Sequence, residues 1–191
     1  MPLLAGAIGF ALAGGASIGR ADHPGPAFPD GPPLARTGGF GEQTCHACHF
    51  DGEENAAGGS LTISGLPQGY VPGQTYRITI ALQRGAMQAG GFQLAARVKD
   101  GPSAGKQAGT LRTTDDRVQV KAAPSGVQYA SHTRPGIQLT TAGRVEWTVE
   151  WTAPDPAAGE VVFHAAGTSA NKDDSPLGDF IYTTMQSSRP R

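Results

Sequence analysis

The sequence has little charge, and the charge that it has is balanced. Of its 191 residues, 16% are charged and the formal net charge is −1. This composition excludes the basic field that binding to nucleic acid or to an anionic membrane surface requires. We therefore expect no nucleic-acid partner. The acidic residues are scattered among predicted turns rather than paired, so we favour a non-catalytic protein over an enzyme.

Long helix-forming runs are also missing, whereas glycine and proline are abundant, with 28 and 15 residues respectively. Such a composition is typical of many short strands joined by turns, and it favours an all-β fold. The length is that of one folded domain with appendages. We therefore expect a single domain with one core.

Alternation of apolar and polar residues predicts the strands. The clearest strand is at 144–152, where apolar residues occupy every second position: Val145, Trp147, Val149 and Trp151. Similar alternation is present at 74–82 and 91–98. Weaker strands are predicted at 61–64, 109–112, 117–121, 127–132, 160–166 and 179–184, with glycine- and proline-rich turns between them. Eight or nine such strands predict an antiparallel β-sandwich over residues 61–191.

The N-terminal segment differs from the rest of the chain. Residues 1–21 are apolar and end in small residues, which indicates a secretory signal peptide or a membrane anchor, although no lysine or arginine precedes Arg20. Residues 22–43 are rich in proline and glycine and predict an extended arm. We expect an exported protein, periplasmic or extracellular, whose N-terminus would provide any attachment to a membrane.

Both cysteines of the chain lie in the stretch TCHACH at residues 44–49. Covalent attachment of haem needs two thiols that reach the vinyl groups of one porphyrin and an imidazole that reaches the iron. The pattern C-x-x-C-H supplies all three groups. It predicts one haem c on a loop at 44–60, with Cys45 and Cys48 as thioether anchors and His49 as the proximal iron ligand.

Other chemistries could use the same residues. A Cys45–Cys48 disulfide suits an oxidising compartment, although so short a loop adds little stability. A thioredoxin-like dithiol normally lies between a strand and a helix, and no helix is predicted here. A structural zinc ion could recruit His46 and His49, but the second ligand pair of finger-type sites is missing. These alternatives stay open.

The second axial ligand separates electron transfer from reaction at the iron, because a haem with two protein ligands is saturated. We predict His132, which ends a predicted strand in YASHTRPG and can lean over a neighbouring loop. For a lone histidine the alternative is a hydrogen-bonded structural role. The alternative ligands are His164, expected to face away from the core, and Met87, expected in a flexible loop. Further candidates are His23, His46 and Met185.

The stretch ANKDDSPLGD gathers four oxygen-bearing side chains in one loop: Asn171, Asp173, Asp174 and Asp179. Oxygen-rich loops can bind calcium, but this spacing does not match an EF-hand. We predict a solvated turn in which these side chains bond to their own backbone.

An ordered set of motifs covers residues 37–184: TGGFGEQTCHACHF, GSLTISGLPQGYVPGQTYRITIAL, GGFQLAARV, YASHT, VEWTVEWTAP and GEVVFHAAGTSANKDDSPLGDFIYT. Together they resemble the bacterial relatives of the reeler (reelin-type) domain, also called choice-of-anchor V domains. The resemblance implies an immunoglobulin-like β-sandwich on an exported protein and, in many bacterial members, a C-x-x-C-H near the start of the domain. His132 falls in a stretch similar to the family's SHT-like motif. The resemblance implies no single established activity.

We therefore predict an exported monohaem c-type cytochrome, an electron-transfer or accessory subunit whose partner is a redox protein or membrane complex. The alternative is a haem-free β-sandwich adhesion or scaffold module at the cell surface. A third hypothesis is a haem-dependent enzyme or gas sensor, which would need an open sixth position at the iron.

Overall fold

The computed structural model describes residue 28 and residues 30–191. The signal peptide or anchor predicted at 1–21 and the candidate ligand His23 lie outside the described residues. In the described part of the chain, no helix is both long enough and apolar enough to cross a bilayer.

Ten strands provide most of the regular structure. They are β1 (Gly59–Ser64), β2 (Gly69–Tyr70), β3 (Thr75–Arg84), β4 (Ala89–Val98), β5 (Thr110–Thr113), β6 (Val118–Ala122), β7 (Gln128–His132), β8 (Arg144–Thr152), β9 (Val161–Ala170) and β10 (Phe180–Pro190). Four short 3-10 turns accompany them: η1 (Gly39–Gly41), η2 (Cys45–Ala47), η3 (Gly101–Ser103) and η4 (Pro135–Ile137).

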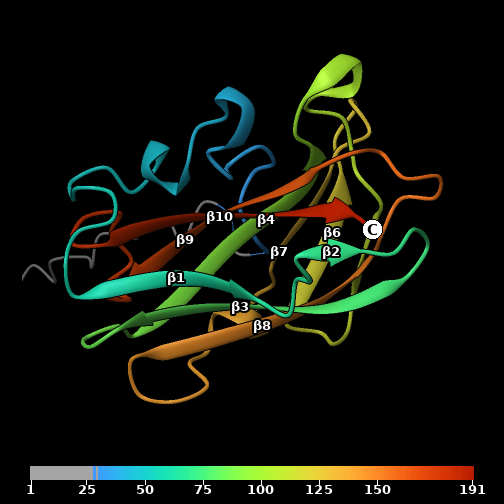
Figure 1. Cartoon of the computed structure of the whole chain (residues 1–191). Helices are drawn as coiled ribbons and strands as arrows, with labels where there is room; N and C mark the ends of the chain where they lie inside the picture. The colour runs from blue at the N-terminus through green and yellow to red at the C-terminus, as the bar shows by residue number, and fades with distance from the viewer. Residues whose placement is uncertain (1–27, 29) are drawn as a thin grey trace, which may run out of the picture.

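The strands form two sheets that pack face to face (Figure 1). The first sheet has the order β1-β3-β8-β5, and the second has the order β2-β10-β9-β4-β7-β6. Strand pairs are antiparallel except for β2 and β10, which run parallel through Gly69–Arg189 and Tyr70–Pro190. The predicted all-β sandwich is confirmed, with this one parallel pairing as an exception to the antiparallel prediction.

The core lies between the sheets and contains the apolar faces predicted from alternation. In β8, buried and half-buried residues alternate along the whole strand, as predicted. Trp147 of β8 stacks on Phe92 of β4 with ring centroids 4.5 Å apart, and Trp151 meets Phe163 of β9 edge-on at 4.9 Å. These aromatic pairs connect one sheet to the other and stabilise the sandwich beyond the area that they bury.

Several strand boundaries in the second sheet differ from the prediction. Strand β9 continues to Ala170 and β10 to Pro190, whereas the predicted strands ended at 166 and 184. The additional residues are mostly small or polar, so they carry no apolar alternation. Strand β2 was missed, because two residues in the turn-rich stretch LPQGYVPGQ show no periodicity.

Strand β4 is buried on both faces, since all ten of its residues are buried. One face, which includes Phe92 and Leu94, points into the core. The other face is covered by the N-terminal arm, whose blue segments in Figure 1 lie on the side of the second sheet away from β1, β3 and β8. The arm is therefore part of the folded domain, and it brings the C-x-x-C-H stretch to this outer face.

Candidate functional site

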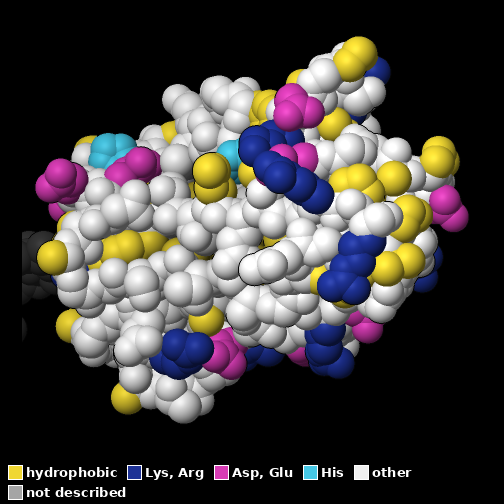
Figure 2. Space-filling view, viewed as in Figure 1, with side chains coloured by type: hydrophobic (Ala, Val, Ile, Leu, Met, Phe, Trp, Pro, Cys, Tyr) yellow, Lys and Arg dark blue, Asp and Glu magenta, His cyan; other side chains and the backbone are white. Residues whose placement is uncertain are grey.

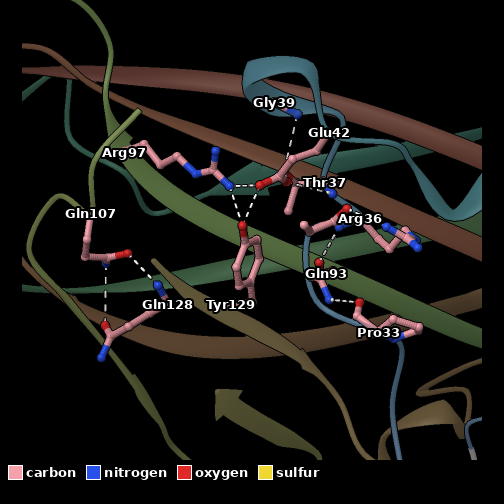
Figure 3. Close-up of polar contacts among 11 residues, drawn as sticks. Pro33, Arg36, Thr37, Gly39, Glu42, Gln93, Arg97, Gln107, Gln128 and Tyr129 are labelled. Carbon is pink, nitrogen blue, oxygen red and sulfur yellow. Dashed lines mark hydrogen bonds and ion pairs between the residues drawn. The ribbon is translucent and has the colours of Figure 1, made fainter. Parts of the chain in front are cut away.

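A glutamine on β4 holds the arm on the sheet (Figure 3). The side chain of Gln93, which is fully buried, accepts a hydrogen bond from the backbone N–H of Arg36 at 2.6 Å. Its amide nitrogen donates to the carbonyl of Pro33 at 2.9 Å. Both contacts use backbone groups of the arm, so they fix its path independently of most arm side chains.

A charged cluster holds the arm again just before the C-x-x-C-H stretch (Figure 3). The Arg97 guanidinium on β4 pairs with the Glu42 carboxylate, which also accepts a hydrogen bond from the Tyr129 hydroxyl on β7. The guanidinium also lies 5.3 Å from the ring centroid of Phe40. Arg97 is only 6% exposed, so the pair is shielded from solvent and breaking it would leave a buried charge.

The C-x-x-C-H stretch itself forms the short 3-10 turn η2. Thr44 caps this turn, because its hydroxyl accepts a hydrogen bond from the backbone N–H of His46 at 3.1 Å. The Thr44 hydroxyl also bonds to the Glu54 carboxylate, which connects the two sides of the loop. The backbone N–H of His49 donates to the carbonyl of Cys45 at 3.1 Å. These bonds give the loop a defined shape without a disulfide.

The two cysteines are free thiols in different surroundings. Cys45 is half-buried and bonds to the side chain of Thr168 on β9, whereas Cys48 is exposed. Burial raises the pKa of the Cys45 thiol to about 11, against the smaller lowering effect of the Thr168 bond. Cys45 is therefore protonated at neutral pH. The alternative of a Cys45–Cys48 disulfide is not the state of this structure.

The imidazole of His49 is held by a buried carboxylate. Its Nδ1 lies 2.6 Å from Oδ2 of Asp179, and the His49 side chain is 33% exposed while that of Asp179 is 2% exposed. Oδ1 of Asp179 accepts the backbone N–H of Asn171 at 3.0 Å. The carboxylate thus has a fixed orientation, and it fixes the ring of His49 in turn.

The imidazole of His132 is held by the backbone of β4. Its Nδ1 lies 3.0 Å from the backbone nitrogen of Phe92 and 3.2 Å from the Phe92 carbonyl oxygen. Burial lowers the pKa of His132; the hydrogen bond to the Phe92 backbone raises it by less, and the nearby charge of His49 lowers it by a still smaller amount. His132 is therefore neutral at physiological pH, as a metal-ligating imidazole must be.

Two predicted site residues, Cys45 and His132, lie beside one pair of residues in the sheet. Gly91 of β4 pairs with Thr168 of β9. The His132 ring occupies the space beside Gly91, where an added Cβ would lie 2.7 Å from Cε1 of the ring. Cys45 bonds to Thr168 on the same pair, and His49 is close enough to affect His132 electrostatically. The fold thus brings residues from the loop and from the end of β7 to one place.

The alternative ligands lie elsewhere. His164 is on the outer face of β9, as expected, and is half-buried against the ring of Phe40 at 5.6 Å between centroids. Burial, followed by the charge of Arg97, lowers its pKa. Met87 lies in the turn between β3 and β4, as expected, but its side chain is 4% exposed and packs in the core rather than in a flexible loop. Met185, 66% exposed, pairs with His164 across β9 and β10.

Two surface hollows flank the loop. The larger, about 590 Å³, is lined by Glu42, Gln43, Thr44, His46, Ala47, Glu53 and Glu54. The smaller, about 420 Å³, is lined by Thr37, Gly38, Thr44, Glu54, His164, Thr183, Thr184 and Met185. Figure 2 shows histidine side chains at the surface in this part of the molecule, beside acidic ones. Neither hollow is lined by His49 or His132.

The acidic loop at 171–178 forms the turn that was predicted, with one exception. The Asn171 and Asp173 side chains accept hydrogen bonds from backbone N–H groups two residues further on. Asp179, predicted to be solvated like the other three residues, is instead buried against His49. Sequence reasoning missed this contact because 130 positions separate the two residues. Within residues 30–191, no group of three or more histidine, cysteine or acidic residues is arranged to bind a metal ion.

Comparison with known proteins identifies the domain. The sequence matches the Reeler domain family over residues 43–174, well over half of the chain, and no curated protein matches it. The reeler domain of human F-spondin is 20% identical, with a TM-score of 0.48, and the match covers 73% of this chain and 92% of that chain. A structure of the Reelin-N domain of F-spondin gives 20% identity, a TM-score of 0.48 and coverage of 76% and 96%. A cohesin module from a Clostridium perfringens family 33 glycoside hydrolase gives 10%, 0.47, and coverage of 71% and 98%. On the family match, the chain belongs to the reeler domain family.

Proposed function

We propose that this reeler domain carries one haem c and acts as an electron-transfer module or accessory subunit of a larger redox complex. Cys45 and Cys48 would hold the porphyrin through thioethers, and His49 and His132 would ligate the iron. A bound haem would supply one-electron transfer between ferric and ferrous iron.

The observation that carries the proposal is the state of the two imidazoles beside the C-x-x-C-H loop. In each ring Nδ1 has a partner, Asp179 for His49 and the Phe92 backbone for His132. Among the described residues, Nε2 of neither ring makes a hydrogen bond. A metal-ligating histidine donates its Nδ1 proton to the partner, which orients the ring and leaves Nε2 for the metal. Asp179 can accept that proton from His49, and His132 meets the condition when its Nδ1–H donates to the Phe92 carbonyl at 3.2 Å instead of accepting the Phe92 N–H at 3.0 Å. The free thiols next to these rings complete a donor set that fits haem c.

Two imidazole ligands favour electron transfer over catalysis at the iron. A six-coordinate haem has no open position for a substrate or a gas, so its chemistry is the exchange of electrons with a partner. Buried His132, neutral at physiological pH, is suited to the second position. We therefore favour an electron carrier over a haem enzyme or a gas sensor.

The fit concerns the donor atoms rather than a ready-made cavity. Both hollows beside the loop are open to solvent, and neither has His49 or His132 in its lining. A porphyrin bound between the two rings would therefore have to displace loop side chains around Cys45, whose thiol packs against Thr168. Cys48 and Phe50 are exposed on this side of the loop.

Family membership favours a second candidate, a haem-free β-sandwich adhesion or scaffold module at the cell surface. The Reeler match supports a β-sandwich module and offers no support for a cytochrome. Reeler domains are typical of extracellular or secreted proteins, so both candidates agree with an exported chain. A periplasmic location and attachment through residues 1–21 are part of our proposal.

The test is to produce the protein in cells with and without a cytochrome c maturation system and to record the pyridine haemochrome spectrum after denaturation. We expect covalent haem in the wild type only with maturation, and none in the Cys45→Ala/Cys48→Ala variant. His46→Ala is the matched control, because it removes an imidazole between the cysteines and should retain the haem. Folded wild-type protein without covalent haem, made beside a reference cytochrome that does acquire it, would leave the haem-free module as the function.

A further inference from the structure

Asp179 is a buried acid whose position suggests a specific role at His49. Asp179 directly precedes β10. Its side chain is 2% exposed, whereas the other acidic residues of the loop are exposed. Both of its carboxylate oxygens have a partner, the Asn171 backbone N–H for Oδ1 and His49 Nδ1 for Oδ2. A carboxylate can only accept hydrogen bonds. The proton on a neutral His49 ring must therefore reside on Nδ1.

We propose that Asp179 is a positioning residue that keeps the proton of His49 on Nδ1, directs the lone pair of Nε2 outward, and lowers the reduction potential of a haem bound there. The inference rests on the proposed haem function for its second part only. The tautomer of His49 is a property of the protein without any haem.

The physical reason for a lower potential is the charge of the acceptor. A carboxylate that accepts the Nδ1 proton increases the basicity of the ring, and a more basic ligand stabilises ferric over ferrous iron. Burial strengthens this effect, because a carboxylate that is 2% exposed is poorly screened by water. A backbone carbonyl at the same position would orient the ring equally well but would carry no full charge.

The substitution Asp179→Asn removes the charge and reverses the hydrogen bond to His49. If the amide oxygen keeps the Asn171 N–H, the amide nitrogen takes the place of Oδ2 and donates to Nδ1 of His49. The ring proton then moves to Nε2, which blocks the ligating nitrogen. Asp174→Asn is the matched control, because Asp174 is an exposed acid of the same loop and its replacement removes the same charge without touching His49.

The first measurement is the ¹⁵N NMR spectrum of haem-free protein at a pH where the imidazoles are neutral. We expect the Nδ1–H tautomer of His49 in the wild type and in Asp174→Asn, and the Nε2–H tautomer in Asp179→Asn. An Nε2–H tautomer in the wild type would overturn the positioning role. This result does not depend on whether the protein takes up haem.

The second measurement is a redox titration of the haem-loaded protein. In Asp179→Asn molecules that acquire haem, iron occupies Nε2 and the ring proton returns to Nδ1, where it faces a neutral amide instead of a carboxylate. The reduction potential is therefore expected to rise clearly more than in Asp174→Asn, with Asp179→Glu restoring part of the wild-type value. Equal shifts in Asp179→Asn and Asp174→Asn would show a general charge effect and overturn the inference. Absence of covalent haem in the wild type would instead refute the proposed function and leave the tautomer result standing.

Discussion

The sandwich core and the C-x-x-C-H loop are stabilised in different ways. The core between β3, β8, β4 and β9 consists of interleaved apolar side chains, with Trp147 and Trp151 fully enclosed. The loop and the arm before it contain single 3-10 turns, and polar contacts to the outer face of β4, β7 and β9 hold them in place. The difference indicates that the sandwich can fold without the loop's contacts, whereas the loop needs the sandwich as its support.

Removing a core aromatic ring should have the largest effect. Trp147 stacks on Phe92, and its indole N–H donates to the Gly136 carbonyl at 2.8 Å. Trp147→Ala should lower the free energy of unfolding by about 3–5 kcal/mol, because it leaves a cavity in a packed core. Urea denaturation followed by tryptophan fluorescence and circular dichroism measures this loss. Thr148→Ala, on the opposite face of β8, should change it by less than about 1 kcal/mol, and similar losses in both variants would contradict the account.

Removing the Arg97–Glu42 ion pair, which holds the arm on the sheet, should have a large but local effect. Arg97→Ala leaves the Glu42 carboxylate without its cation in a shielded position, which should destabilise the docked arm by about 3 kcal/mol. Hydrogen exchange should accelerate at residues 34–48 while β3 and β8 stay protected. Lys99→Ala removes the pair between exposed Lys99 and Glu160 but leaves Glu160 paired with Arg189, so it should cost less than about 1 kcal/mol. Faster exchange throughout the sandwich in Arg97→Ala would show that arm and core fold as one unit.

Acidification should weaken the fold through the buried imidazoles. Burial lowers the pKa of His132 and of His164 below the value of about 6.5 expected in the unfolded chain. The unfolded state therefore binds more protons than the folded state in this range. The free energy of unfolding should be highest above about pH 7 and should fall as the pH decreases through about 6. His132→Gln should reduce the slope between these values, and an unchanged slope would show that His132 is not the group responsible.

The cysteines should differ in reactivity without any change in stability. With a pKa of about 11, Cys45 is ionised in only about one molecule in a thousand at pH 8, and it is also half-buried. Iodoacetamide should therefore modify exposed Cys48 well before Cys45, as read by peptide mass spectrometry. In urea the two rates should converge. Equal rates in the folded protein would contradict the packing of Cys45 against Thr168.

The sequence predicts the core better than the site for a physical reason. Alternation along β8 and β4 reports burial directly, so strands and inward-facing residues such as Trp147 and Leu94 could be identified from local pattern. The outer face of β4 could not, because Gln93 and Arg97 are buried by contacts with an arm about 55 residues earlier. The full length of β10 could not be predicted either, because most of its last residues are polar.

At the candidate site, the sequence could name residues with an intrinsic chemical signature but not the partners that hold them. Cys45, Cys48 and His49 stand out as C-x-x-C-H, and His132 could be named as an imidazole at a strand end. Asp179 could not be distinguished from the other acids in its loop, because its role depends on a single contact across 130 positions. Met87 lies in the loop that RGAMQAGG predicts, but the burial of its side chain in the core depends on the tertiary fold and could not be predicted from that local sequence.

If the loop and the sheet supply two imidazoles to one haem, the absorption spectrum of the matured protein reports both ligands. We predict a six-coordinate low-spin spectrum in the wild type and in His164→Ala. His132→Ala should become high-spin and should bind carbon monoxide when reduced, because one axial position is then open. A wild type that acquires no covalent haem, or a His132→Ala variant that stays low-spin and does not bind carbon monoxide, would contradict the account.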